Sequence, residues 1–298
     1  MQTPTAGIAK AALWMTGAIV SFSSMAIAGR EAGLTLDTFE IMTYRSLVGL
    51  IVVLAAVTVS RKWHKVRTDR LGLHMVRNLA HFTGQNLWFY AVTAIPLAQV
   101  FALEFTSPIW VIILSPLMLG ERMTRLRAGA AILGFIGILI VARPSPETIS
   151  PGILTAAACA IFFALTAVFT KRLTRHEDIV SILFWLTAMQ LFFGLVMSGW
   201  DGDIALPDLK TLPWLVLIGL AGLTAHFCLT TALSLAPATV VMPIDFTRLP
   251  IIAILGMLIY GEEVVIWTLV GAVVIFVANY INILDASGKL RTGHTGPV

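Results

Sequence analysis

Ten apolar runs of about 20 residues fill this chain, and they constrain its fold more than any other feature. A transmembrane helix needs about 20 mostly apolar residues, whereas a transmembrane strand needs only about 10. The runs therefore predict an all-α integral membrane protein with ten transmembrane helices. They cover approximately residues 7–28, 38–60, 71–94, 96–119, 126–142, 151–171, 179–199, 211–233, 237–260 and 264–284.

The composition excludes several classes of protein. Of the 298 residues, 58% are hydrophobic and only 12% are charged, which is about half the charged fraction of an average soluble domain. A soluble enzyme, a disordered chain and a nucleic-acid-binding protein are therefore excluded. Cys159 and Cys228 both lie inside apolar runs, so they indicate neither a disulfide framework nor a metal site.

An internal repeat predicts the architecture. When the chain is shifted by 141 positions, residues 91–121 align without a gap on 232–262 with ten identities in 31 positions, including Pro96 on Pro237. Each half then contains five spans, and because five is odd the second half enters the membrane in the opposite orientation. We therefore expect two five-helix inverted-topology repeats, at 1–143 and 144–285, followed by a cytoplasmic tail at 286–298.

Basic residues in the loops predict the orientation. With the N-terminus in the cytoplasm, the inner segments carry 14 lysines and arginines and the outer loops carry three. This bias follows the positive-inside rule, so both termini are expected in the cytoplasm. The membrane itself is expected to be a bacterial inner membrane. The bias also accounts for the net charge of +4 without a nucleic-acid partner. An alternative for the first run is a signal peptide that ends in Ala26-Ile27-Ala28.

Five charged residues lie inside the spans and are expected to face the interior of the bundle, because a charge in lipid is costly. Arg45 and Glu104 lie at similar depth, which predicts an ion pair that holds the bundle together or couples transport. Asp245 is expected to pair with Arg248, three residues later on one helix face, or with Arg77. Arg77 also has the alternative of extending its side chain to the cytoplasmic interface.

A polar stripe on the third span indicates a water-filled cavity. Asn78, His81, Gln85 and Trp88 follow helical spacings of three and four. Such a stripe is too polar to face lipid, although a buried histidine often only joins two helices. The candidate substrate-binding residues are Asn78, His81, Gln85, Trp88, Phe101, Asp245 and Arg248.

Prolines predict where two helices bend. Pro108 interrupts the fourth span and Pro250 the ninth, and each removes a hydrogen bond to the carbonyl four residues earlier. Interrupted helices at matching places in two halves point to the binding site and hinge of a transporter. The alternative is a kink that serves packing only.

No enzyme or metal motif stands out. The chain lacks an H-E-x-x-H pair, a G-x-S-x-G elbow, a phosphate loop and a dinucleotide fingerprint. We therefore expect neither enzymatic activity nor a cofactor or metal. Proton coupling through His81, Glu104 or Asp245 stays open.

The ten spans, the inverted repeat and the residues Arg45, Pro96, Gly120-Glu121, Pro237 and Gly261-Glu262 resemble the drug/metabolite transporter superfamily, specifically its EamA-type permeases. The resemblance covers essentially the whole chain. It implies a central cavity lined by spans 1–4 and 6–9, with spans 5 and 10 at the periphery.

The expected function is secondary transport of a small metabolite by alternating access. Among similar proteins, bacterial exporters of amino acids and related metabolites look closest. The alternatives are a transporter of S-adenosylmethionine, riboflavin or a purine, and less favoured, a channel or scramblase. The expected partners are a small-molecule substrate and the lipid bilayer, with the chain as a monomer or homodimer.

Overall fold

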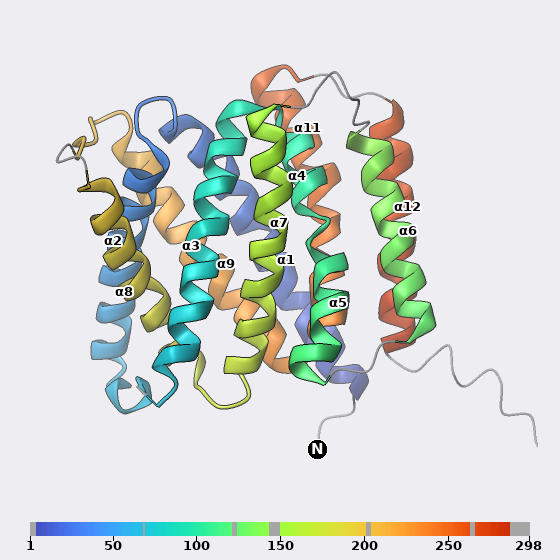
Figure 1. Cartoon of the computed structure of the whole chain (residues 1–298), viewed down its shortest axis with the longest axis horizontal. Coiled ribbons are helices and arrows are strands. Elements are labelled where there is room, and N and C mark those ends of the chain that lie inside the picture. The colour runs from blue at the N-terminus through green and yellow to red at the C-terminus, as the bar shows by residue number, and fades with distance from the viewer. Residues whose placement is uncertain are drawn as a thin grey trace, which may run out of the picture.

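The computed structural model describes residues 4–67, 69–120, 124–142, 150–200, 204–262 and 266–286, and these residues are almost entirely helical (Figure 1). The helices are α1 (Pro4–Ala32), α2 (Thr38–Val59), α3 (Leu71–Ala94), α4 (Leu97–Glu104), α5 (Ser107–Leu119), α6 (Arg125–Ala142), α7 (Pro151–Leu173), α8 (Ile179–Ser198), α9 (Leu212–Leu235), α10 (Ala238–Ile244), α11 (Arg248–Tyr260) and α12 (Ile266–Ala286). The predicted boundary between 143 and 144 and the tail beyond 286 lie outside these residues.

The helices have the length and composition of a membrane protein. Six described segments are long and apolar enough to cross a bilayer. They are Gly7–Ala32, Thr38–Val59, Pro151–Leu173, Ile179–Ser198, Leu212–Leu235 and Ala238–Tyr260. Helix α3 is as long as these but carries the polar stripe, so its side chains need protein or water around them.

The fourth and ninth predicted spans are each divided into two helices. Helix α4 ends at Glu104 and α5 begins at Ser107, whereas α10 ends at Ile244 and α11 begins at Arg248 after a short 3-10 turn. Pro108 is the second residue of α5 and Pro250 the third of α11, positions where a missing N–H costs little. The structure thus shows a break beside each predicted hinge, and motion at the breaks remains a proposal.

The helices pack as two related halves. Helix α1 packs along α9, and α7, its counterpart in the second half, packs along α3. Helix α2 packs against its counterpart α8 at one edge of the bundle, and α6 against its counterpart α12 at the other (Figure 1). This exchange of partners is what a pseudo-twofold axis between the halves produces.

Two cations at equivalent positions show that the halves run in opposite directions. Arg30, near the end of α1, donates to the carbonyls of Val92 and Ile95 at 2.8 and 2.7 Å. Lys171, 141 residues later near the end of α7, donates to the carbonyls of Leu233 and Ala236 at 2.5 and 2.8 Å. A methyl group on Gly152, at the start of α7, would lie 2.8 Å from Ile95, so α7 begins where α1 ends.

Small residues set the closest helix contacts. A methyl group on Gly137 of α6 would lie 2.8 Å from the side chain of Ile275 and 3.0 Å from the carbonyl of Gly271, both on α12. A methyl group on Gly194 of α8 would lie 2.6 Å from the hydroxyl of Thr43 and 3.0 Å from its Cα on α2. Backbone approaches of this kind are typical of packed membrane helices.

We expect Gly194→Ala to destabilise the protein by roughly 1–3 kcal/mol, because the added methyl group must push the α2 backbone away. The measurement is thermal unfolding of the purified protein in detergent. Gly72→Ala on α3 is the matched control, since nothing lies within 4 Å of the added methyl group. The control should be neutral or stabilising by up to about 1 kcal/mol. Equal stability of the two variants would contradict the packing argument.

Candidate transport cavity

A cavity lies between the two halves of the chain. Much of its wall consists of residues that occupy equivalent positions in the two repeats, 141 residues apart. These pairs are Phe22 and Phe163, Met25 and Thr166, Gln85 and His226, Trp88 and Leu229, Glu104 and Asp245, and Ser107 and Arg248. The cavity therefore lies on the pseudo-twofold axis.

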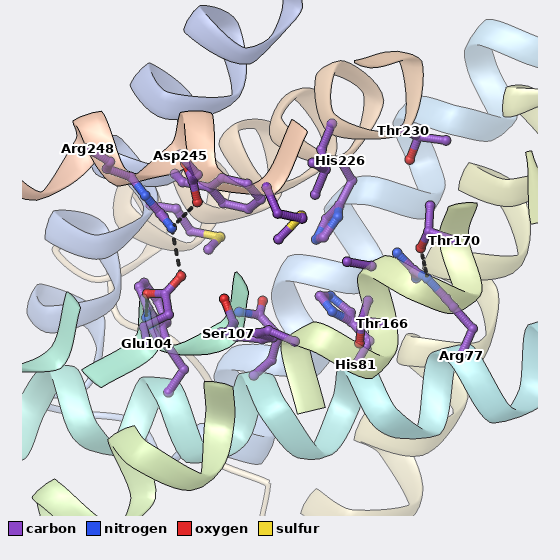
Figure 2. A pocket seen from close by; sticks show the side chains of 18 residues that line it. Arg77, His81, Glu104, Ser107, Thr166, Thr170, His226, Thr230, Asp245 and Arg248 are labelled. Carbon is purple, nitrogen blue, oxygen red and sulfur yellow. Dashed lines mark hydrogen bonds and ion pairs between the residues drawn. The ribbon is translucent and has the colours of Figure 1, made fainter. Parts of the chain in front are cut away.

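One arginine holds the two equivalent carboxylates together at one end of the cavity (Figure 2). The Nη2 of Arg248 donates to Glu104 Oε1 at 2.6 Å and to Asp245 Oδ2 at 2.7 Å. Only 2% of the Arg248 surface is exposed. The predicted pairing of Asp245 with Arg248 is thus present, and the broken helices bring the two groups together from both halves.

The surroundings of Arg248 explain why it tolerates burial. Its guanidinium carbon lies 4.8–5.0 Å from the ring centres of Phe22, Phe101 and Phe105, so three aromatic faces surround the cation. Trp88 Nε1 donates to the second oxygen of Glu104 at 2.7 Å. We predicted Phe101 in the cavity wall, but it does not line the cavity and instead places its ring against Arg248.

The predicted pair of Arg45 and Glu104 is wrong. The structure pairs Glu104 with Arg248, whereas Arg45 donates to the Oε1 atom of Gln85 and to the sulfur of Met42. The depth of a residue along its span was the basis of the prediction, but depth does not determine the direction in which a side chain points. Arg45 is buried between α2 and the stripe on α3.

The polar stripe of α3 divides into two parts. His81, Gln85 and Trp88 line the cavity as predicted. Asn78 does not, because its amide nitrogen donates to the carbonyl of Trp185 on α8 at 3.3 Å. Its side-chain oxygen accepts a 2.8 Å hydrogen bond from Arg77, so Asn78 links helices and supports an arginine.

Two histidines meet near the middle of the cavity. The rings of His81 and His226 are 4.5 Å apart and perpendicular, and Phe22 and Phe163 flank the pair. Both ring nitrogens of His81 and the Nε2 of His226 are buried without a hydrogen-bond partner. Buried polar atoms normally have partners, so these nitrogens are available to a bound molecule.

Sequence reasoning missed several residues of the wall. Phe22, Thr166, Thr170, His226 and Thr230 line the cavity. Of these, only His226 follows from a predicted residue, because Gln85 shifted by 141 positions falls on it.

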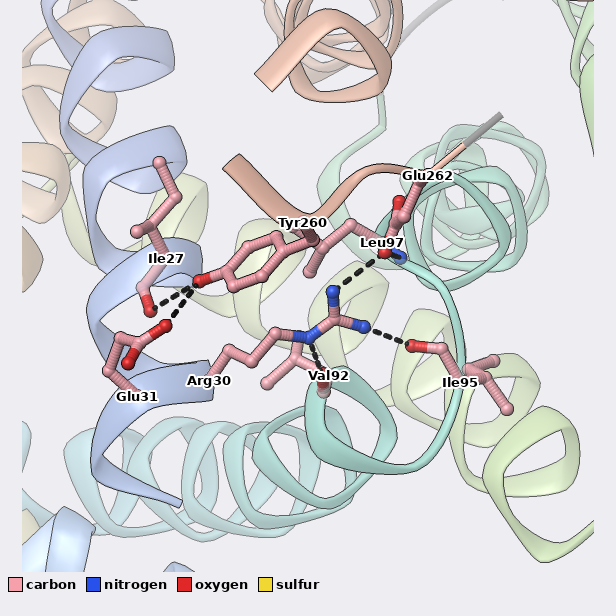
Figure 3. Close-up of polar contacts among 8 residues, drawn as sticks. All are labelled: Ile27, Arg30, Glu31, Val92, Ile95, Leu97, Tyr260 and Glu262. Atoms are coloured by element: carbon pink, nitrogen blue, oxygen red, sulfur yellow. Dashed lines mark hydrogen bonds and ion pairs between the residues drawn. The ribbon is translucent and has the colours of Figure 1, made fainter. Parts of the chain in front are cut away.

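A group of polar contacts joins the two halves where α1, α3 and α11 end (Figure 3). Glu262 accepts hydrogen bonds from Arg30 at 2.7 Å and from the backbone N–H of Leu97 at 3.2 Å. Tyr260 donates to Glu31 at 3.0 Å, and its ring lies 4.7 Å from the guanidinium carbon of Arg30. We call these residues the Arg30 latch.

Comparison with known proteins identifies the family. The sequence profile of the EamA-like transporter family matches residues 9–143 and 150–284. The chain belongs to the EamA-like transporter family. It is therefore a membrane transporter of the drug/metabolite transporter superfamily with two EamA repeats, as the sequence predicts, and not an enzyme.

Named relatives and a solved structure agree with this EamA assignment. A riboflavin transporter of Brucella anthropi is 31% identical over 288 residues, which cover 93% of this chain and 100% of the relative. An S-adenosylmethionine uptake transporter of Rickettsia felis is 28% identical over 283 residues, which cover 94% of this chain and 95% of the relative. A crystal structure with 17% identity shares the fold, with a TM-score of 0.78 over 96% of this chain and 99% of the other.

Proposed function

We propose that this EamA protein is a secondary transporter that carries a small metabolite through the central cavity by alternating access. The observation that carries the proposal is the position of the cavity on the repeat axis. Matching wall residues come from both halves, so a molecule bound in the cavity contacts both halves at once. A movement of one half relative to the other therefore changes the surroundings of the bound molecule. Sites at the interface of inverted repeats are characteristic of secondary transporters.

The substrate class that we propose is a metabolite with a flat, nitrogen-rich ring, as in riboflavin and S-adenosylmethionine. The named relatives transport these compounds, and this support favours them over the amino acids that the sequence first suggested. The histidine pair with Phe22 and Phe163 supplies ring faces and unpaired nitrogens, which suit stacking and hydrogen bonding with such a ring.

The Arg30 latch is proposed to close one end of the cavity. It joins α1 and α4 of the first half to the residues that follow α11 in the second half. At the other end, α5 packs along α7 much more extensively than its counterpart α11 packs along α1. Among the described residues these two helix pairs are therefore packed to different extents, as expected for one state of an alternating-access cycle.

Uptake into proteoliposomes tests the function. Labelled riboflavin, S-adenosylmethionine and an amino-acid mixture are supplied with and without a pH gradient, and empty liposomes are the control. Saturable uptake of either ring-containing compound supports the proposal. Uptake of amino acids alone would overturn the substrate class, and single-channel currents would favour a channel. A dependence on the pH gradient would establish proton coupling, which the sequence leaves open.

His81→Ala is expected to lower kcat/KM for the transported compound about tenfold or more, since the proposed hydrogen bond and ring contact to that compound are lost. Uptake rates across substrate concentrations measure the effect. His64→Ala, which changes an exposed histidine outside the cavity, is the matched control and should transport normally. Unchanged transport by His81→Ala would remove the histidine pair from the site.

The predicted topology also has a direct test. We expect tags at both chain ends to be accessible from the cytoplasm. Accessibility of the two tags from opposite faces of the membrane would contradict the arrangement of two five-span halves. Bacterial relatives support a bacterial membrane, and the inner membrane remains our proposal.

A further inference from the structure

Arg77 is a buried cation in the cavity wall, at the end opposite the two carboxylates (Figure 2). Only 1% of its surface is exposed, so it does not extend to the interface as the sequence allowed. Its Nε donates to the hydroxyl of Thr170 at 3.1 Å and its Nη1 to the Asn78 side chain at 2.8 Å. Both partners are neutral.

No ion pair among the described residues includes Arg77. A buried charge without a counter-charge costs several kcal/mol, and ionisable residues inside membrane-spanning bundles commonly mark substrate or ion pathways. Arg248 at the other end differs, because two carboxylates already contact it. The cavity is thus positive at the Arg77 end and carries two carboxylates against one arginine at the Arg248 end.

Further polar atoms near Arg77 lack partners. The hydroxyl of Thr230 and the Nε2 of His226 are both buried without a hydrogen bond, and both residues line the cavity. The hydroxyl of Thr170 accepts its bond from Arg77 and keeps a proton to donate. Figure 2 shows Arg77, Thr170, Thr230 and His226 on one side of the cavity, away from Glu104.

We infer that Arg77, with the hydroxyls of Thr170 and Thr230, binds an anionic group of the transported metabolite. The inference rests on the proposed function and adds the charge of the substrate to it. A guanidinium binds a carboxylate or a phosphate through two parallel hydrogen bonds, which the neutral partners of Arg77 leave possible. This chemistry does not by itself distinguish the two anions.

The two ends also orient the substrate. Arg77 and Trp88, which holds Glu104, are separated by eleven residues of α3, or about 16 Å along the helix axis. An anionic group at Arg77 directs the rest of the molecule toward Glu104 and Asp245, where a positive or neutral hydrogen-bond donor is favoured and a second anion is repelled. The site therefore selects an extended dipolar metabolite.

Two pairs of probes test this inference on the purified full-length protein. S-adenosylmethionine and its decarboxylated form differ by a carboxylate, and riboflavin 5′-phosphate and riboflavin differ by a phosphate. Binding is measured as ligand-induced thermal stabilisation, with wild type, Arg77→Gln and Arg77→Lys. We expect the anionic member of one pair to bind wild type on the order of ten- to a hundredfold more tightly than its partner.

Arg77→Gln should abolish this preference and leave the binding of the partner that lacks the anion unchanged, and Arg77→Lys should restore part of it. Thr230→Val is a second variant that retains the arginine, and it should weaken only the anionic members, several-fold. The pair that shows the preference identifies carboxylate or phosphate.

Equal binding of both members of each pair by wild type would overturn the inference, as would an equal loss of both members in Arg77→Gln. Absence of binding by all four probes, in a protein that takes up another metabolite, would also overturn it. Failure of the proposed function gives a different result from failure of this inference. In that case the protein would still bind the anionic probe more tightly than its partner but would show no uptake into proteoliposomes.

Discussion

Arg248→Ala is expected to destabilise the protein by about 3–5 kcal/mol, the largest effect of any single substitution considered. The change leaves the carboxylates of Glu104 and Asp245 buried, close together and without a counter-charge. Removing one partner of a buried ion pair typically has a cost of this size. Thermal and denaturant unfolding of the purified protein in detergent measure the loss.

Neutralising the carboxylates separates charge from packing. Arg248→Ala combined with Glu104→Gln and Asp245→Asn should recover most of the lost stability, because no unpaired charge remains. The lost contacts with Phe22, Phe101 and Phe105 would account for the remainder. A single Arg248→Ala variant as stable as wild type would show that the carboxylates are neutral or hydrated without the arginine.

The second large effect is expected at the Arg30 latch. Glu262→Ala removes hydrogen bonds to the guanidinium of Arg30 and to the N–H of Leu97. A hydrogen bond to a charged group contributes about 1.5–3 kcal/mol, so the balance between closed and open forms should shift by about tenfold or more. The thiol of Ser107→Cys, placed in the cavity wall, reports the shift through its rate of reaction with a membrane-impermeant reagent.

The labelling experiment uses a background in which Cys159 and Cys228 are replaced, and reagent is added from either side of the membrane. Labelling should accelerate from the side of the latch only. Lys65→Ala is the matched control, since the half-buried pair of Lys65 and Asp178 also joins the two halves. Equal acceleration in Lys65→Ala, or none in Glu262→Ala, would show that the latch does not limit access.

The sequence was sufficient to predict the helical membrane fold, the repeat and part of the cavity wall. Apolar runs of about 20 residues report helices directly, and matched residues such as Pro96 and Pro237 report the duplication. His81, Gln85 and Trp88 were located correctly because a helical period fixes which residues share a face.

Contacts between distant helices were harder to predict. Arg45 and Glu104 have similar depth but point to different neighbours. The sequence allows Arg77 to reach the interface, but α7 covers it through Thr170. The helix breaks before Ser107 and Arg248 turn the side chains near them in ways that an unbroken period does not describe. The pair of Asp245 and Arg248 could be predicted because the two residues are only three positions apart.

The exchange of Ser107 for Arg248 at equivalent positions has a consequence for energetics. If the two halves were identical, swapping their conformations would give a state of the same free energy, and the empty protein would populate both equally. Arg248 has no equivalent arginine in the first half, and it pairs with one carboxylate from each half, so the two states differ in free energy. The side of the membrane to which the empty cavity opens is then determined by positions at which the two repeats differ. Exchanging the residues at these positions between the repeats would reverse that preference.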